Sequence, residues 1–359
     1  MKRQHIQSLA TLQLIAVLAI VASHFWLADG TYLQSLCVSF CFLYSGYFSA
    51  STHPVDYYYG PLEHAWYMRY KLFKLYPLYV LALALCLLAA YLCWGSNLVF
   101  SKVTFAHLTM LSPWIPTPGY YFGINPVAWF ICVLFFLYLI APLIIKPLRR
   151  MSLGWQVAIV VVLIGAEMLA GYARDPASPS LLIPAPAHYF LYEFPPVRIL
   201  DFTTGIVLFH VTQSRCWRDA ASRLNATFAT LVEVCAVLAF LAFYRLGETL
   251  LHPHWYRAFC SAAPAVLTVL AAFVFTGGKR GAFSRLLSMP WLAVPCAITA
   301  EIYLLQYGVF ALVRYVVMRV GMATEGLAYF MLQSLTLLLV AMAVHYGFVM
   351  PLYRRLRSH

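Results

Sequence analysis

One histidine, His24, stands inside the first long apolar stretch of the chain, residues 9–28. An ionisable side chain in a membrane helix is costly, so it is a hypothesis for function. A neutral imidazole can take the proton of a hydroxyl group while that group attacks a carbonyl carbon. A histidine that only hydrogen-bonds a neighbouring helix is the alternative, and position alone favours neither. Gln13 lies about three helical turns earlier on nearly the same stripe, so it is a candidate supporting residue.

Three cations, Arg69, Lys71 and Lys74, stand where the third apolar stretch begins, residues 70–95. On residue types alone, anchoring of the helix to anionic lipid headgroups is the favoured interpretation. The alternative is an anion site at a cytoplasmic entrance, where the cations hold the phosphates of a nucleotide-bearing donor.

Several carboxylates lie within apolar stretches, where they should face the interior of a helix bundle. Asp201 follows Arg198 by one turn, which predicts a local ion pair. Glu301 opens the segment EIYLLQ, which ends at Gln306. Such groups could tune the pKa of His24, position a substrate or form a proton path, and the sequence does not choose among these roles. The carboxylates are Glu167, Asp201, Glu233 and Glu301.

The nine cysteines are scattered and form no C-x-x-C pair, which predicts buried thiols rather than a metal site or disulfides. Motifs for other chemistries are missing: there is no P-loop, no G-x-G-x-x-G after a strand, no H-E-x-x-H and no G-x-S-x-G. We therefore expect no bound metal.

Composition indicates the environment that positions these residues. The chain is 63% hydrophobic and 10% charged, whereas a soluble domain is about 45–50% apolar and about 25% charged. We predict an all-α, polytopic integral membrane protein with about ten spans. The predicted spans are 9–28, 31–50, 70–95, 126–145, 154–172, 197–213, 225–246, 257–276, 291–316 and 326–350.

Basic residues predict the orientation of these spans. With both termini in the cytoplasm, most of the 24 Lys and Arg fall in inner segments, as the positive-inside rule requires. Topology thus accounts for most of the net charge of +12, and nucleic acid is not needed as a partner. His24 lies about 15 residues into its span, roughly 22 Å along it, which places it in the outer half of the bilayer.

Two predicted outer segments, residues 112–125 and 176–196, are rich in proline and aromatic residues. Packing at the membrane interface explains this composition, and so does an ordered cap that holds a sugar or lipid on aromatic faces. We expect a single transmembrane domain over residues 1–359 without an appended soluble domain.

Six segments in this order resemble motifs of the membrane acyltransferase 3 family, which includes O-acetyltransferases of bacterial surface polysaccharides. The resemblance covers essentially the whole chain. The segments are ASHFW (22–26), FLYSGYF (42–48), RYKLFKLYPLY (69–79), NPVAWFICVLFFLYLIAPLI (125–144), FPPVRILDFTTGIVL (194–208) and AEIYLLQ (300–306).

The resemblance implies a ten-helix membrane fold that takes an acyl group from cytoplasmic acyl-CoA and delivers it to a hydroxyl of a glycan or lipid-linked sugar. His24 matches the family's essential histidine, proposed as the base. Arg69 and Lys71 match its basic loop, which raises the donor-phosphate interpretation above the anchor interpretation. Arg198 and Asp201 match the fifth motif, with Asp in place of the usual Glu.

The chain departs from the family at three positions. The family usually carries an arginine at the position of Gln13 and an aspartate at that of Ala10, and a histidine is common at that of Gln306. Glutamine donates hydrogen bonds but carries no charge, so stabilisation of an anionic donor or of a developing oxyanion would be weaker.

We therefore expect an acyl-CoA-dependent O-acyltransferase, in the first instance an acetyltransferase, in the cytoplasmic membrane of a bacterium. His24 would deprotonate the acceptor hydroxyl for direct attack on the thioester. Ser45 and Cys41 keep an acyl-enzyme open as an alternative. The rival classes are a transporter or flippase, in which the carboxylates and His24 line a path, and a non-catalytic relative in glycan assembly. The sequence gives no oligomeric state.

Overall fold

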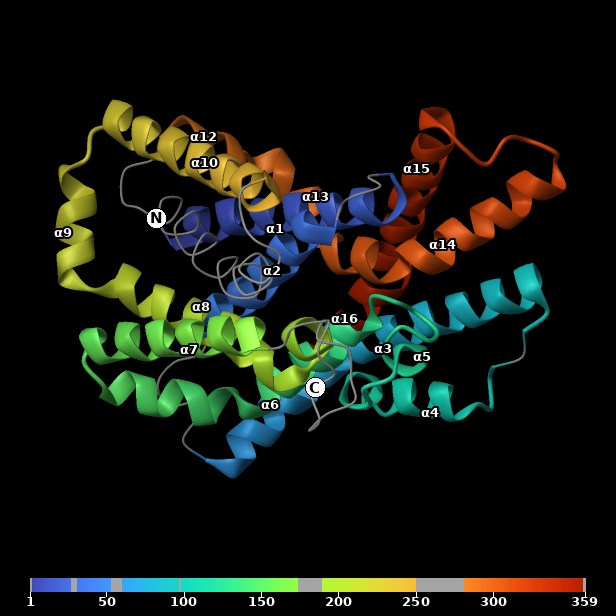
Figure 1. The fold of residues 1–359 in the computed structure, drawn as a ribbon, viewed down its shortest axis with the longest axis horizontal. Helices are drawn as coiled ribbons and strands as arrows, with labels where there is room; N and C mark the ends of the chain where they lie inside the picture. The colour runs from blue at the N-terminus through green and yellow to red at the C-terminus, as the bar shows by residue number, and fades with distance from the viewer. Residues whose placement is uncertain are drawn as a thin grey trace. The chain divides into compact units, whose positions relative to one another are not determined.

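The predicted all-α fold is confirmed. The computed structural model describes residues 2–26, 31–52, 60–96, 98–173, 189–249 and 281–357, and within these ranges every regular element is helical (Figure 1). The elements are α1 (Lys2–Phe25), α2 (Thr31–Thr52), α3 (Pro61–Trp94), α4 (Lys102–Leu108), η2 (Ser112–Trp114), α5 (Pro118–Tyr121), α6 (Ala128–Arg150), α7 (Leu153–Ala173), η3 (Tyr189–Glu193), η4 (Pro195–Arg198), α8 (Ile199–Gln213), α9 (Arg215–Arg223), α10 (Ala226–Thr249), α12 (Ala282–Leu287), η5 (Pro290–Leu292), α13 (Ala293–Ala297), α14 (Thr299–Arg319), α15 (Leu327–Val344), η6 (His345–Val349) and α16 (Met350–Arg357).

Six helices in the described part of the chain are long and apolar enough to cross a membrane. Each predicted span coincides with helix except 257–276, which lies outside the described residues, so the count of ten and the side of the termini stay predictions. The six segments are Gln7–Phe25, Leu62–Trp94, Ala128–Arg150, Leu153–Ala170, Thr299–Arg319 and Leu327–Arg355.

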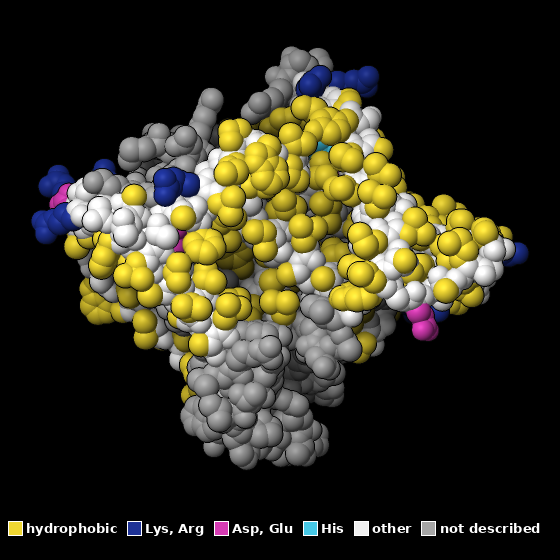
Figure 2. Space-filling view, turned by 90° about the horizontal axis from the view of Figure 1, so that it is seen from above, with side chains coloured by type: hydrophobic (Ala, Val, Ile, Leu, Met, Phe, Trp, Pro, Cys, Tyr) yellow, Lys and Arg dark blue, Asp and Glu magenta, His cyan; other side chains and the backbone are white. Residues whose placement is uncertain are grey.

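The described surface suits a lipid environment. Figure 2 shows a face on which hydrophobic side chains prevail and Lys and Arg lie toward the edges. Large apolar side chains such as Leu143, Trp155 and Leu169 are exposed along α6 and α7. Broad exposed apolar surface of this kind marks contact with a membrane or a protein partner.

The chain forms two compact units. The first comprises residues Met1–Gly60 and Leu139–Cys296. In it, α2 packs along α8, α1 packs on α2, and α7 packs on α8. Residues 200–208 of α8 are all buried, so this helix lies in the core of the unit. Because protein rather than lipid surrounds α2 and α8, they can be the least hydrophobic of the predicted spans and still be helical.

Glycines permit the close approach of α2 and α8. A Cβ atom at Gly46 would overlap the backbone carbonyl of Phe202, and one at Gly205 would overlap the backbone carbonyl of Leu43. Small residues at a helix crossing let two backbones touch and gain dispersion contacts. The glycines of two of the family-like motifs, FLYSGYF and FPPVRILDFTTGIVL, are therefore explained by packing.

The second unit comprises residues Pro61–Tyr138 and Ala297–His359. In it, α14 packs along α3 and against α15. The segment between α3 and α6 is ordered by hydrogen bonds to these helices. Tyr79 Oη donates to the His107 carbonyl at 2.8 Å, and Asn125 Nδ2 donates to the Leu304 carbonyl at 2.9 Å. The predicted outer segment 112–125 is thus packed onto its unit, while residues 176–188 of the other outer segment lie outside the described residues.

Candidate functional site

His24 lies in the last turn of α1, in the first unit. The helix ends at Phe25, earlier than the predicted span 9–28, so His24 stands closer to the helix end than the sequence indicated. Its side chain is half-buried, and its ring meets that of Phe25 edge-on with centroids 6.0 Å apart. The carbonyl end of a helix stabilises positive charge, so this position suits a histidine that gains a proton.

Gln13 is half-buried on the same helix but cannot touch His24. Eleven residues of α-helix separate them, a rise of about 16 Å. The two side chains could therefore meet only different parts of one extended ligand. The same limit holds for the arginine that the family usually carries at this position.

Ser45 is not arranged as a nucleophile. Its hydroxyl is buried and donates to the carbonyl of Cys41 in its own helix at 2.8 Å. An activated serine needs a base within hydrogen-bonding reach of its oxygen, and none bonds to Ser45 among the described residues. This geometry favours direct transfer over an acyl-enzyme on Ser45.

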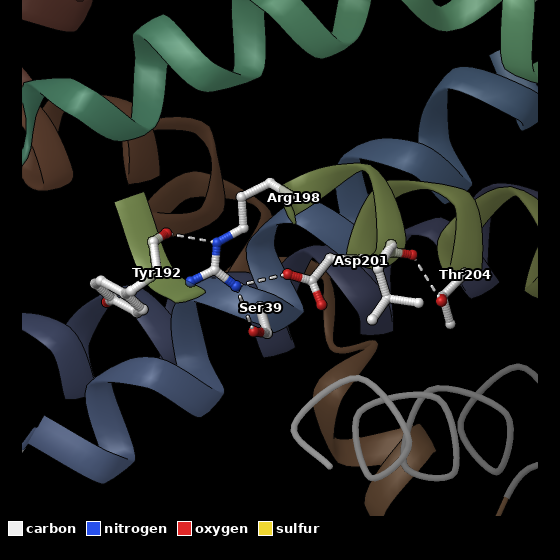
Figure 3. Close-up of polar contacts among 6 residues, drawn as sticks. Ser39, Tyr192, Arg198, Asp201 and Thr204 are labelled. Atoms are coloured by element: carbon white, nitrogen blue, oxygen red, sulfur yellow. Dashed lines mark hydrogen bonds and ion pairs between the residues drawn. The ribbon is translucent and has the colours of Figure 1, made fainter. Parts of the chain in front are cut away.

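Arg198 and Asp201 form a buried ion pair where α8 begins (Figure 3). Arg198 Nη1 lies 2.8 Å from Asp201 Oδ2, and each residue is 2% exposed. The same nitrogen donates to the Ser39 hydroxyl at 3.1 Å, and Nε donates to the Tyr192 carbonyl at 2.8 Å. The predicted local pair is therefore confirmed, and the guanidinium also ties α2 and η3 to α8.

The groups around this ion pair serve to pack the helices together. The guanidinium carbon of Arg198 lies 5.5 Å from the ring centre of Phe42 and 4.8 Å from that of Tyr192. Asp201 occupies the first turn of α8, where a carboxylate is favourable to the helix dipole. Because protein groups already occupy Nε and Nη1, we interpret Arg198 as a packing residue rather than a ligand for donor phosphates.

Glu167 of α7 lies near this ion pair. It interacts electrostatically with both Asp201 and Arg198, and its Oε1 is buried without a hydrogen bond to any described residue. The cluster thus brings two carboxyl groups close to one guanidinium.

Glu233 of α10 has a structural role. It is buried and accepts hydrogen bonds from the backbone N–H groups of Gly281 at 3.1 Å and Phe283 at 3.0 Å, and from the Ser284 hydroxyl. These groups form the start of α12. A carboxylate in this position satisfies free N–H donors and complements the helix dipole.

The three cations Arg69, Lys71 and Lys74, here called the basic trio, lie in the second unit, where one is buried and two are exposed. Lys71 is 7% exposed, and its Nζ lies 3.9 Å from the ring centre of Tyr138 and 5.3 Å from that of Tyr67. Arg69 and Lys74 are exposed on the surface of α3. Within the described residues, no carboxylate pairs with Lys71. A buried cation that lies over two aromatic rings is suited to bind an anion.

Glu301 of α14 pairs with His345, a residue that the sequence analysis missed. Glu301 Oε1 lies 2.7 Å from His345 Nδ1, and Glu301 is buried. His345 begins η6, a π-helical turn of the kind that recurs at functional sites. The rule that singled out His24, an ionisable residue in an apolar stretch, applies equally to His345 and would have found it.

Gln306 is fully buried, but its Nε2 donates at 2.8 Å to the carbonyl of Tyr303 in its own helix. It therefore does not share the Glu301–His345 pair through any described hydrogen bond. The structure thus groups Arg198 with Asp201 and Glu167 in the first unit, and places the basic trio, Glu301 and Gln306 in the second. Among the described residues, no three His, Cys, Asp or Glu side chains gather to hold a metal.

Comparison with known proteins agrees with the motifs. The family model of acyltransferase 3, described as an acyltransferase domain, matches residues 6–353. The acyltransferase MdmB of Streptomyces mycarofaciens is 26% identical over 285 residues, which cover 74% of this chain and 69% of the relative. No solved structure matches the chain. With its helical fold, its apolar spans and a match over nearly its whole length, the chain belongs to the acyltransferase 3 family and is a membrane acyltransferase.

Proposed function

We propose that the protein transfers an acyl group, in the first instance acetyl, from cytoplasmic acyl-CoA to a hydroxyl of a cell-surface polysaccharide or lipid-linked sugar. The match to the acyltransferase family over residues 6–353 carries the class of reaction. The geometry adds the burial of Lys71 between two tyrosines without a carboxylate partner among the described residues. We propose the cytoplasmic membrane of a bacterium as its location.

The donor site in this proposal lies on α3. Lys71 supplies a desolvated ammonium, while the exposed Arg69 and Lys74 extend positive charge along the same helix. Phosphate oxygens accept charge-assisted hydrogen bonds from lysine and arginine, and these bonds are roughly twice as strong as neutral ones. Burial makes Lys71 unsuited to anchor lipid headgroups, so the donor interpretation is favoured.

His24 is the proposed general base. Its imidazole takes the proton of the acceptor hydroxyl, the oxygen bonds to the thioester carbonyl carbon, and the carbon–sulfur bond breaks. The acceptor then carries the acyl ester, and CoA leaves. The hydrogen bond of Ser45 to its own helix supports direct attack without an acyl-enzyme.

The transporter alternative loses support from the same contacts. Glu233 caps α12, and Asp201 is paired with Arg198, so two of the four carboxylates proposed for a path serve packing instead. Asp201 lies in α8, which forms the core of the first unit.

The proposed function is tested in the bacterium that carries the protein and with purified protein. Acetyl-ester content of the surface glycan is measured in a deletion strain that expresses the wild type, His24→Ala or Ser23→Ala, with protein levels matched. Ser23→Ala is a suitable control because, among the described residues, its hydroxyl donates to the carbonyls of Ala19 and Ile20 in its own helix. We expect ester to be lost with His24→Ala alone. Unchanged acetylation in the His24→Ala strain would refute the assignment.

A further inference from the structure

The Glu301–His345 pair has the geometry of a carboxylate that orients a proton-transferring imidazole. Oε1 of Glu301 lies 2.7 Å from Nδ1 of His345. The Glu301 side chain is 3% exposed and that of His345 is 16% exposed, so the carboxylate is sealed while the His345 side chain is partly exposed. A carboxylate on Nδ1 fixes the ring orientation and leaves Nε2 to exchange a proton.

The pair belongs to the same unit as the basic trio and lies along α3. The π-helical turn η6, which His345 begins, packs against α3. Tyr353 of α16 shares a hydrogen bond with Tyr70 of α3 at 2.5 Å, and Tyr70 stands between Arg69 and Lys71 in the chain. His345 and Tyr353 are eight residues apart, about 12 Å along continuous helical backbone.

This separation suits a long donor molecule. In acyl-CoA, the extended pantetheine arm separates the thioester from the phosphates. If the phosphates of such a donor bind the basic trio, the protein groups that act on its sulfur must lie at a distance from that trio. α16 adds Arg354 and Arg355, both exposed, to the positive charge at the Tyr70–Tyr353 contact.

We propose that His345 is the general acid for the leaving thiolate and that Glu301 positions it, an inference that rests on the proposed function. As the acceptor oxygen bonds to the carbonyl carbon and the carbon–sulfur bond breaks, the His345 imidazolium gives its Nε2 proton to the sulfur. CoA leaves as the thiol, and the acceptor's proton goes to the general base. That base then returns a proton to water and His345 takes one from water, so the reaction has no net proton change. Glu301 compensates the charge of the imidazolium.

The test compares two donors that differ in their need for an acid. Purified wild type, His345→Gln and Glu301→Gln are assayed for thiol release from acetyl-CoA, with water as acceptor, and from 4-nitrophenyl thioacetate, whose thiolate leaves without a proton. For His345→Gln we expect kcat with acetyl-CoA to fall about 100-fold or more, with KM nearly unchanged and the aryl thioester rate nearly unchanged. Glu301→Gln should show a smaller loss, again restricted to acetyl-CoA.

Gln333→Met is the matched control. Gln333 joins α15 to α14 through one hydrogen bond from Nε2 to the Phe310 carbonyl at 3.2 Å, but it transfers no proton. Any loss of activity in Gln333→Met should be the same with both donors. An equal loss with both donors in His345→Gln, or full acetyl-CoA turnover, would overturn the role of His345. If His345→Gln does not fold, the rate of Glu301→Gln with acetyl-CoA relative to its rate with the aryl thioester tests the proposal. No acetyl-CoA turnover by the wild type would instead contradict the proposed function itself.

Discussion

Gly46 of α2 and Gly205 of α8 each face the backbone of the other's helix, so that a methyl group on either would overlap a carbonyl group of the opposite helix. The two glycines lie in segments that are about 160 residues apart in the sequence. Their contact holds together the core of the first unit, where α2 and α8 pack along each other.

We predict that Gly46→Ala and Gly205→Ala each destabilise the protein by about 1–3 kcal/mol or more, because backbone cannot yield as a side chain can. Thermal unfolding in detergent, with yield of monodisperse protein, measures this. Gly165→Ala on α7 is the control, since its Cβ would meet no atom within 4 Å. Wild-type stability of both core variants would contradict the packing described.

Removal of Arg198 should cost stability rather than donor binding. Arg198→Met leaves Asp201 and Glu167 without their cation, and breaking one partner of a buried ion pair costs about 3–5 kcal/mol. We expect a low yield of folded protein, with unchanged KM for acetyl-CoA in the fraction that folds. A well-folded Arg198→Met protein with a raised KM would show that the guanidinium binds donor after all.

Lys71→Met should raise KM for acetyl-CoA about tenfold or more. The contact of a buried ammonium with an anion contributes at least about 1.4 kcal/mol to the free energy of binding. Methionine fills a similar volume between Tyr67 and Tyr138, so the fold should persist. Lys102→Met on α4 serves as the control, since this exposed lysine lies between two predicted spans, 70–95 and 126–145. Equal KM values for wild type and Lys71→Met would remove the lysine from the donor site.

His107 on α4 should make stability fall in acid. Burial lowers its pKa to about 4 from the usual 6.5, although the nearby backbone of Tyr120 acts in the opposite direction. Between these values the unfolded chain binds a proton that the folded protein does not, so stability is present above about pH 6.5 and is lost as pH falls toward 4.

The loss from His107 amounts to about 3 kcal/mol over that range. Thermal unfolding from pH 4 to 7 measures it, and His107→Phe should flatten the curve relative to the wild type. The same slope in both proteins would assign the acid sensitivity to other groups.

The sequence by itself determined the class of the protein and much of its helical organisation. Runs of apolar residues marked every described helix that can span a membrane, and the ordered motifs indicated the acyltransferase 3 family before any comparison. The one-turn spacing of Arg198 and Asp201 also predicted their ion pair, because that contact is local and depends only on helix geometry.

Only the tertiary structure decided which side chains meet across helices. Lys71 and Lys74 are one turn apart, yet one is buried and the other exposed. Glu233 caps a helix about 50 residues later, and Glu301 meets His345 at the far end of the chain. In a soluble helix, polarity distinguishes the core face from the solvent face. A membrane helix is apolar toward lipid and toward protein alike, so its sequence does not reveal which face is buried or which partner it contacts.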